Sequence, residues 1–198
     1  MAAVSPSVVV LGGPNGAGKT TTAPRLLRGT LRVDEFVNAD TLAQGLSAFR
    51  PEDAAIEAGR IMLQRLDYLE SHEASFAFES TLASQALARR LTRLKRLGYS
   101  VHVVYLWLPG TELALARVAA RVRAGGHSVR PEIVRRRFHR GRRNFLTLYR
   151  GLATTWRVYD ASSLRPRLLA TGGSGRRTSI LDPDTWRVAA GEENDDRS

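Results

Sequence analysis

The chain has 198 residues, of which 43% are apolar and 25% are charged, and these proportions are typical of a folded globular protein. This length fits one domain with a sizeable core, and the absence of cysteine excludes a disulfide scaffold, a thiolate zinc site and cysteine catalysis. The net charge of +11 favours a polyanionic partner, either a nucleic acid or a phosphate-rich small molecule.

This charge is concentrated in one part of the chain. Residues 80–181 carry 21 basic and three acidic side chains, whereas residues 1–79 carry seven basic and ten acidic ones. Of the 30 basic residues, 28 are arginine, a bias that a GC-rich genome also produces. We therefore expect part of the excess to be solvated surface.

The sequence contains no sign of a membrane or targeting segment. No apolar run approaches the ~20 residues that a membrane-spanning helix requires. Residues 1–7 contain no basic side chain, and the apolar run 8–11 is too short for a signal peptide. The expected location is the cytoplasm.

Short β-branched runs and amphipathic segments alternate along the chain. In chain order, the predicted elements are a strand at 8–11, a helix at 19–28, a strand at 36–40, a helix at 51–72, a strand at 75–79, a helix that carries Leu87, Leu91 and Leu94 and ends at Gly98, a strand at 99–108, helices at 111–124 and 131–149, and short strands at 158–159, 167–171 and 178–181. Residues 191–198 form an acidic tail that is predicted to be disordered.

This alternation predicts a mainly parallel sheet flanked by helices, with ligands at the carboxyl ends of the strands. No repeat or long linker divides the chain, so a single domain is expected over residues 1–190. The helix at 51–72 is expected to bury a face made of Ile56, Met62 or Leu63, Leu66 and Leu69.

A phosphate-binding loop follows the first strand. It matches the pattern Gly-x-x-x-x-Gly-Lys-Thr and opens a predicted helix, which is the context that this motif requires. Its glycines let backbone N–H groups converge on phosphate oxygens, Lys19 would reach the β- and γ-phosphates, and the Thr20 hydroxyl would ligate Mg²⁺. The predicted site for ATP or GTP and Mg²⁺ is made of Gly13, Pro14, Asn15, Gly16, Ala17, Gly18, Lys19, Thr20 and Thr21.

Other classes of nucleotide-binding protein would need motifs that the sequence lacks. A hydrophobic strand that ends in a Mg²⁺-binding Asp is not evident, and the Asn-Lys-x-Asp of GTPases and the signature of ABC-type subunits are absent. The remaining class is a small phosphoryl-transfer enzyme, in which catalysis is mainly positioning and charge neutralisation.

Three polar residues at strand ends are candidates for the acceptor side. Asp40 can take the proton of the attacking hydroxyl, or it can cap the helix that begins near Thr41. Glu79 can bind an acceptor hydroxyl or a Mg²⁺-bound water, or it can be a plain surface residue. Thr81 can contact the substrate or cap the next helix.

Residues 117–143 contain ten arginines. Arg117 and Arg121 share one helix face, and Gly125 and Gly126 form a hinge. The segment of about 117–145 therefore suits an Arg-rich helical lid that closes on the triphosphate. A solvated or phosphate-attracting surface, opposite the apolar Val134, Phe138 and Phe145, is expected at Arg136, Arg140 and Arg143.

The phosphate loop and four further motifs occur in the order seen in the zeta-toxin family of bacterial P-loop kinases. These motifs are Asn38-Ala39-Asp40-Thr41, Phe78-Glu79-Ser80-Thr81, Gly98-Tyr99-Ser100-Val101 and Gly125-Gly126-His127. The sequence resembles this family over roughly residues 7–160. The resemblance implies a three-layer α/β fold of the P-loop kinase type with a helical lid.

The resemblance also implies a function. It points to an ATP- or GTP-dependent kinase for a hydroxyl of a sugar nucleotide such as UDP-N-acetylglucosamine, with a small antitoxin protein that blocks the nucleotide site. It places Asp40 at the catalytic base, Glu79 at the substrate-binding position beside Thr81, and Arg121 at a lid arginine that acts with Lys19 on the phosphates.

Arg130 matches a second lid arginine, on the substrate side. The chain is shorter than the well-known toxins and is similar to a compact subgroup in which proline often follows Val129. Here Arg130 comes first and Pro131 follows.

Two other functions stay open. A nucleic-acid-associated enzyme, such as a polynucleotide kinase or an ATP-driven binding protein, would use the basic half of the chain. Base stacking needs exposed aromatic rings, however, and Phe138 and Phe145 fall on an apolar face, so a small-molecule substrate is expected rather than nucleic acid. A nucleotide-binding module without catalysis is disfavoured by the intact Lys19, Asp40 and Glu79.

Overall fold

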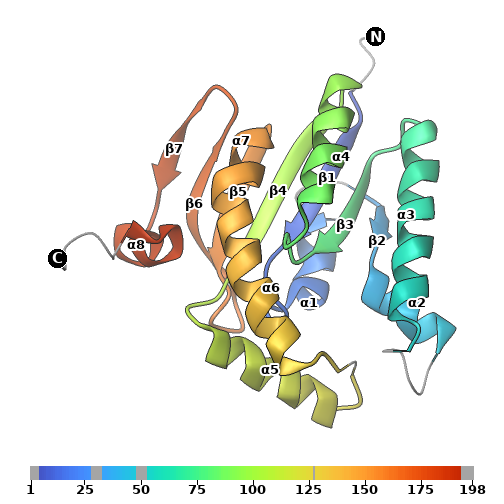
Figure 1. The fold of residues 1–198 in the computed structure, drawn as a ribbon. Coiled ribbons are helices and arrows are strands. Elements are labelled where there is room, and N and C mark those ends of the chain that lie inside the picture. The colour runs from blue at the N-terminus through green and yellow to red at the C-terminus, as the bar shows by residue number, and fades with distance from the viewer. Residues whose placement is uncertain (1–4, 28–32, 48–52, 127, 193–198) are drawn as a thin grey trace.

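The computed structural model describes residues 5–27, 33–47, 53–126 and 128–192, and in these ranges seven strands form one sheet (Figure 1). The strands are β1 (Ser7–Gly12), β2 (Glu35–Val37), β3 (Phe76–Ser80), β4 (Ser100–Trp107), β5 (Thr155–Asp160), β6 (Arg167–Gly173) and β7 (Arg176–Ile180). Their order is β2-β3-β1-β4-β5-β6-β7. The first five strands in this order pair in parallel, and β6 and β7 are antiparallel.

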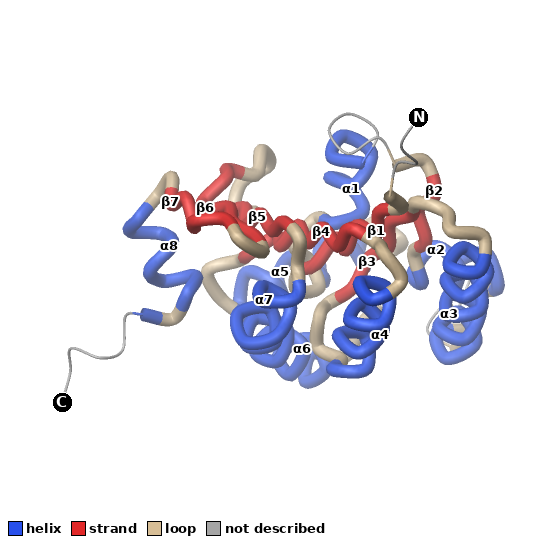
Figure 2. The backbone as a smooth tube through the Cα atoms, turned by 90° about the horizontal axis from the view of Figure 1, so that it is seen from above, coloured by secondary structure: helices blue, strands red, loops and turns tan. Residues whose placement is uncertain are grey.

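Helices connect the parallel strands and cover the sheet. They are α1 (Lys19–Pro24), α2 (Ala39–Leu46), α3 (Ala55–Ser71), α4 (Gln85–Arg96), α5 (Thr111–Arg123), α6 (Pro131–Asn144), the π-helical turn η2 (Phe145–Tyr149), α7 (Arg150–Leu152) and α8 (Pro183–Ala190). Figure 2 shows α3, α4, α6 and α7 on one side of the sheet and α1 on the other. Within the described ranges, no helix has the length and apolar character to cross a membrane.

Strand β1 is apolar on both faces because it lies between two hydrophobic clusters. Val8 and Val10 pack with side chains of α3, α4, η2 and α8, including Leu66, Leu91, Phe145 and Trp186. Val9 and Leu11, whose side chains point to the other face of the strand, belong to the second cluster, which also includes Ala23 of α1, Val118 of α5 and Phe138 of α6. The predicted mainly parallel, helix-flanked sheet is confirmed.

The register of the parallel strands brings three strand ends to one edge. Leu11 of β1 pairs with Glu79 of β3, and Val37 of β2 pairs with Phe78. The loops that follow β1, β2 and β3 therefore start side by side. The predicted phosphate loop, Asp40 and Glu79 come from these three ends.

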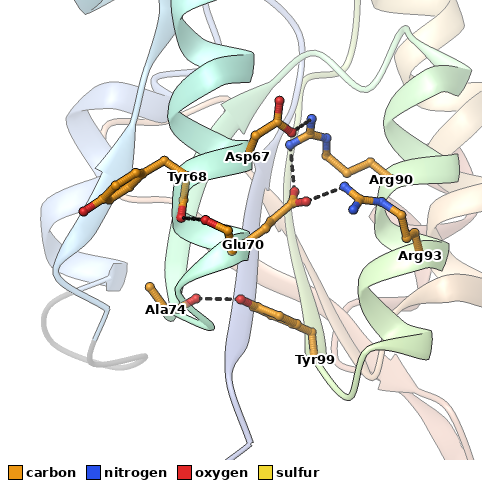
Figure 3. Close-up of polar contacts among 8 residues, drawn as sticks. Asp67, Tyr68, Glu70, Ala74, Arg90, Arg93 and Tyr99 are labelled. Atoms are coloured by element: carbon orange, nitrogen blue, oxygen red, sulfur yellow. Dashed lines mark hydrogen bonds and ion pairs between the residues drawn. The ribbon is translucent and has the colours of Figure 1, made fainter.

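A partly buried ionic network joins α3 to α4 (Figure 3). The Glu70 carboxylate, whose side chain is 5% exposed, pairs with Arg90 at 2.7 Å and also with Arg93. Arg90 makes a second ion pair with Asp67 at 2.6 Å. Because Glu70 is buried with two cationic partners, removing either partner would leave a poorly compensated charge.

Several predicted elements have different bounds. The predicted strand at 36–40 ends at Val37, because α2 already begins at Ala39. The helix predicted at 51–72 is described from Ala55, and its proposed start at Pro51 lies outside the described residues. Helix α8 was not predicted from the sequence, and β5 is longer than the predicted 158–159.

The predicted buried face of α3 is wrong in part. Leu66 and Leu69 are buried, and of the alternatives Met62 and Leu63 it is Met62 that packs against the core, whereas Ile56 is 75% exposed. The two leucines join the core cluster and lie in the C-terminal half of the helix. Its N-terminal turn lies beside a cleft, and Ile56 lines that cleft.

Candidate active site

The phosphate loop takes a conformation that requires glycine. Gly13 and Gly16 have φ of 142° and 80°, in the region that side-chain-bearing residues avoid. A Cβ atom at Gly13 would lie 2.5 Å from the Leu106 carbonyl oxygen, and one at Gly16 would lie 2.7 Å from that of Ala114. The loop is thus packed tightly between the end of β4 and helix α5.

Lys19 begins α1 and folds back over the loop. Its ammonium donates to the carbonyl oxygens of Gly13 and Pro14, both at 3.0 Å. Burial lowers the pKa of Lys19 below its usual 10.5, and the nearby Glu79 and Asp40 carboxylates oppose this shift. The cation is therefore held at the point where the predicted triphosphate would lie.

Asp40 lies in the first turn of α2, and Asn38 is the N-cap of that helix. The Asn38 Oδ1 atom accepts hydrogen bonds from the backbone N–H of Asp40 at 2.8 Å and of Thr41 at 3.4 Å. The alternative role of Asp40 as the N-cap is therefore wrong. Its carboxylate, 47% exposed, forms a 3.7 Å ion pair with Arg121 at the end of α5.

Glu79 is the next-to-last residue of β3 and is largely buried. Burial raises the pKa of Glu79 above its usual 4.5, while Lys19 and a hydrogen bond with the Thr20 side chain oppose this shift. Its Oε1 atom is buried and has no hydrogen-bond partner among the described residues. The surface alternative for Glu79 does not fit this burial.

These groups line one cleft of about 620 Å³. The polar lining includes Lys19, Asp40 and Glu79, which come from the ends of β1, β2 and β3. The cleft is also lined by Asn15, Asn38, Ala39, Ala43, Ala55, Ile56, Ser80, Thr81, Ser128, Val129, Arg130, Ile133 and Arg137. The Asn15 Oδ1 atom is a second buried acceptor with no partner in the described ranges.

Three arginines border this region, and they differ in exposure. Arg121 reaches Asp40, whereas the Arg130 side chain is 77% exposed and pairs at 3.4 Å with Glu132 of its own helix turn. Arg137 is half-buried, lines the cleft and is close enough to depress the pKa of Lys19. Sequence reasoning missed Arg137, although its position three residues after Val134 on the predicted helix could have placed it beside the apolar face.

Arg117 has a different environment from Arg121. Its guanidinium donates to the carbonyl oxygens of Ala161 and Ser162, both at 2.6 Å, and of Gly16 at 3.4 Å. It thereby ties the phosphate loop to the segment after β5. Arg117 and Arg121 share one helix face, but Arg117 binds backbone carbonyl groups whereas Arg121 pairs with Asp40.

Thr81 lines the cleft and is not a helix cap, since the N-cap of α4 is Ser84. Helix α6 presses against this segment, because a Cβ atom at Gly141 would lie only 2.1 Å from the Thr81 carbonyl oxygen. Asn144 donates to the Leu82 carbonyl oxygen at 2.8 Å. Thr21 is exposed on α1, and His127 lies outside the described residues.

Residues 8–147 match the family AAA_33, which is described as an AAA domain. The chain belongs to this family. The match contains the phosphate loop and all the cleft residues named above. A relative from Haemophilus influenzae, an uncharacterized protein, is 32% identical over 128 residues, which are 64% of this chain and 88% of that one.

Solved structures show the same fold at low sequence identity. A crystal structure of AvrRxo1-ORF1:-ORF2 with ATP has a TM-score of 0.75 at 17% identity, over 99% of this chain and 67% of that one. The PezAT chromosomal toxin-antitoxin system of Streptococcus pneumoniae has a TM-score of 0.63 at 16% identity, over 95% of this chain and 80% of that one. The resemblance to the zeta-toxin kinases is thus confirmed at the level of the fold, which is that of a P-loop kinase.

Proposed function

We propose that this protein is a small-molecule kinase that transfers the γ-phosphate of ATP or GTP to a hydroxyl of a sugar nucleotide such as UDP-N-acetylglucosamine. The observation that carries the proposal is the convergence of Lys19, Asp40 and Glu79 on one cleft. A phosphate-binding cation, a candidate base and a hydrogen-bond acceptor are what a transfer to a hydroxyl requires.

Each side chain has one task in the proposed reaction. The Asp40 carboxylate accepts the proton of the acceptor hydroxyl, whose oxygen forms a bond to the γ-phosphorus. The bond from that phosphorus to the bridging oxygen of the β-phosphate breaks, and the nucleoside diphosphate leaves. Lys19, Arg121 and Arg137 compensate the negative charge on the transferred group.

The acceptor would be oriented by hydrogen bonds. The unpartnered Glu79 Oε1 atom and the Asn15 Oδ1 atom would each accept a bond from a hydroxyl or amide group. Thr81 would contribute at the same wall of the cleft. A sugar, which offers several hydroxyl donors, suits such acceptors.

Oxygen ligands for Mg²⁺ are present beside the phosphate loop. The Thr20 hydroxyl lies next to Glu79, with which it forms a hydrogen bond, and 3.4 Å from the Asn38 amide nitrogen. Mg²⁺ in phosphoryl-transfer sites is held by few protein oxygens together with the phosphates, so this arrangement fits the ion. When bound, Mg²⁺ would neutralise phosphate charge.

The proposed lid is narrower than the predicted segment of about 117–145. Val118, Val134 and Phe138 belong to the core cluster, and Arg117 is fixed on backbone carbonyl groups. The described residues Ser128, Val129 and Arg130, which come just before α6, line the cleft and are the remaining part of the proposed lid. Arg121 of α5 and Arg137 of α6 flank it.

A protein partner is also proposed. The AvrRxo1-ORF1 and PezAT structures both contain a second protein, in the latter case as a toxin-antitoxin system. By analogy, this chain would be inhibited by a small antitoxin protein. Co-expression with a candidate antitoxin tests this point: the two proteins should co-purify and phosphoryl transfer should be lost.

The test of the proposed reaction is incubation of the full chain with ATP, Mg²⁺ and a panel of sugar nucleotides and nucleosides. Mass spectrometry should detect one added phosphate on a sugar nucleotide. The Lys19→Ala variant lacks the phosphate-binding cation, so its rate of phosphoryl transfer should be lower by ~10²-fold or more. Transfer only to nucleosides would overturn the acceptor class, and no transfer to any member would overturn the kinase proposal.

A further inference from the structure

The outward sides of α4 and α6 form a basic surface, here named the outer basic face. Both helices lie on the same side of the sheet (Figures 1 and 2), and hydrogen bonds from Asn144 and Tyr149 link the end of α6 and η2 to the loop before α4. The face consists of the exposed side chains Arg89, Arg96, Arg136, Arg140 and Arg143.

None of these five arginines has an ion pair with a residue that the structure describes, in contrast to three other arginines of the same two helices. Arg90 and Arg93, on the side of α4 that faces α3, are compensated by Asp67 and Glu70. On α6, Arg135 is compensated by Glu112 of α5. The outer basic face therefore retains its full charge.

No acidic side chain lies on the surface of α4, and Glu132 is the one acidic residue of α6. Glu132 is in the first turn and is already paired with Arg130 at 3.4 Å. The exposed arginines on α6 recur every three or four residues, about 4.5–6 Å apart along the helix axis. The result is a row of cations without local anions.

The chemistry of this face favours nucleic acid over an acidic protein. Protein interfaces have an apolar core, but the exposed large apolar side chains of the described ranges reach this face only at Leu97, after the end of α4. Protein–DNA interfaces are polar and strongly positive. Phe138 and Phe145 are 6% and 2% exposed, so no ring on α6 is available for base stacking.

We propose that the outer basic face binds the sugar-phosphate backbone of nucleic acid, without reading its sequence. The guanidinium groups contact successive phosphates, and the bases make no contact with aromatic side chains. This binding is separate from the proposed kinase function, because the five arginines face solvent and do not line the cleft. The site stays available whether or not the cleft transfers phosphate.

The test compares two charge-reversed variants of the full chain. R136E/R140E/R143E changes the outer basic face, and R165E/R176E/R177E makes the same change in net charge at exposed arginines near β6 and β7. Binding of a fluorescent DNA duplex is measured by anisotropy at several salt concentrations. Thermal unfolding checks that both variants fold. If a charge-reversed variant does not fold, the same three arginines are changed to alanine instead.

We expect the first variant to reduce the slope of log K against log salt by about three, one for each phosphate that the protein no longer neutralises, with a large fall in affinity at low salt. The control should keep most of the wild-type slope. Equal losses of affinity in the two variants would overturn the proposal, because overall charge would then explain the binding.

Two competitors complete the test. Poly-glutamate that binds the wild-type chain as tightly as the duplex would overturn the proposal in favour of an acidic protein partner. Displacement of the duplex by ATP would place it in the cleft and would also overturn the proposal. Persistence of duplex binding with ATP present supports a separate site.

Discussion

The Arg121 Nη1 atom lies 3.7 Å from the Asp40 Oδ2 atom, so the last turn of α5 reaches the first turn of α2. The two side chains are 38% and 47% exposed, and such a pair contributes little to stability. The pair matters for position, because it holds the proposed base next to a cation that flanks the proposed lid.

The variant Asp40→Asn should lose phosphoryl transfer and keep its fold. We expect kcat to fall by ~10²–10⁴-fold, because the amide cannot accept the hydroxyl proton. ATP affinity, measured by titration, should stay within a few fold, and the melting temperature should barely change because Asn38 is the cap. Retained transfer would remove Asp40 from the reaction and leave Glu79 as the next candidate base.

The change Asn38→Ala should lower the stability of the protein, which Asp40→Asn leaves almost unchanged. It removes the side chain that accepts the hydrogen bonds of Asp40 and Thr41. Loss of an N-cap costs about 1 kcal/mol, which denaturant unfolding can resolve. An unchanged unfolding midpoint would show that this cap does not stabilise α2.

Glu79 should make stability depend on pH. Burial raises the pKa of Glu79 above 4.5, so between that value and the raised pKa the folded protein holds a proton that the unfolded chain has released. The contribution of Glu79 to the free energy of unfolding is therefore complete below pH 4.5 and is lost as the pH rises through the raised pKa. The variant Glu79→Gln lacks this titration.

Urea unfolding of both proteins across this pH range provides the measurement. The stability of the wild type relative to Glu79→Gln should decrease as the pH rises. Parallel pH profiles for the two proteins would show that the carboxyl group titrates in the folded state as it does in water.

Arg137→Ala should slow phosphoryl transfer by about 10²-fold, the effect of removing one preorganised charge. Arg136→Ala is the control on the adjacent residue, whose side chain is exposed and does not line the cleft. Steady-state kinetics should separate the two variants. Equal activities would contradict a role for Arg137 at the phosphates.

Gly141→Ala should destabilise the protein, because the new Cβ atom would lie 2.1 Å from the Thr81 carbonyl oxygen. Overpacking of this kind typically costs 1–3 kcal/mol, so about 2 kcal/mol is expected. Gly59→Ala is the control, since that glycine lies within α3 and has nothing within 4 Å of its Cβ position. Gly59→Ala should stabilise the helix by about 0.5–1 kcal/mol. Thermal unfolding measures both variants, and a melting temperature that shifts in the same direction in both would contradict the close contact of Gly141 with Thr81.

Local patterns were sufficient for much of the fold and part of the site. The strand β1, the phosphate loop and α1 follow from a β-branched run, glycines and a helix start that are contiguous in sequence. The positions of Asp40 and Glu79 at the carboxyl ends of strands also followed, because parallel strands place these ends at one edge. Boundaries failed at β2, where the capping side chain of Asn38 ends the strand.

The sequence by itself determined the phosphate-binding loop, the helix-flanked parallel sheet and the excess of arginine. Only the tertiary structure decided what each arginine does. Arg117 binds backbone carbonyl groups, Arg121 meets Asp40, Arg137 lines the cleft and Arg136 faces solvent. Helical periodicity defines which arginines share a face, but the partners come from distant segments, so their roles depend on how the helices pack on the sheet.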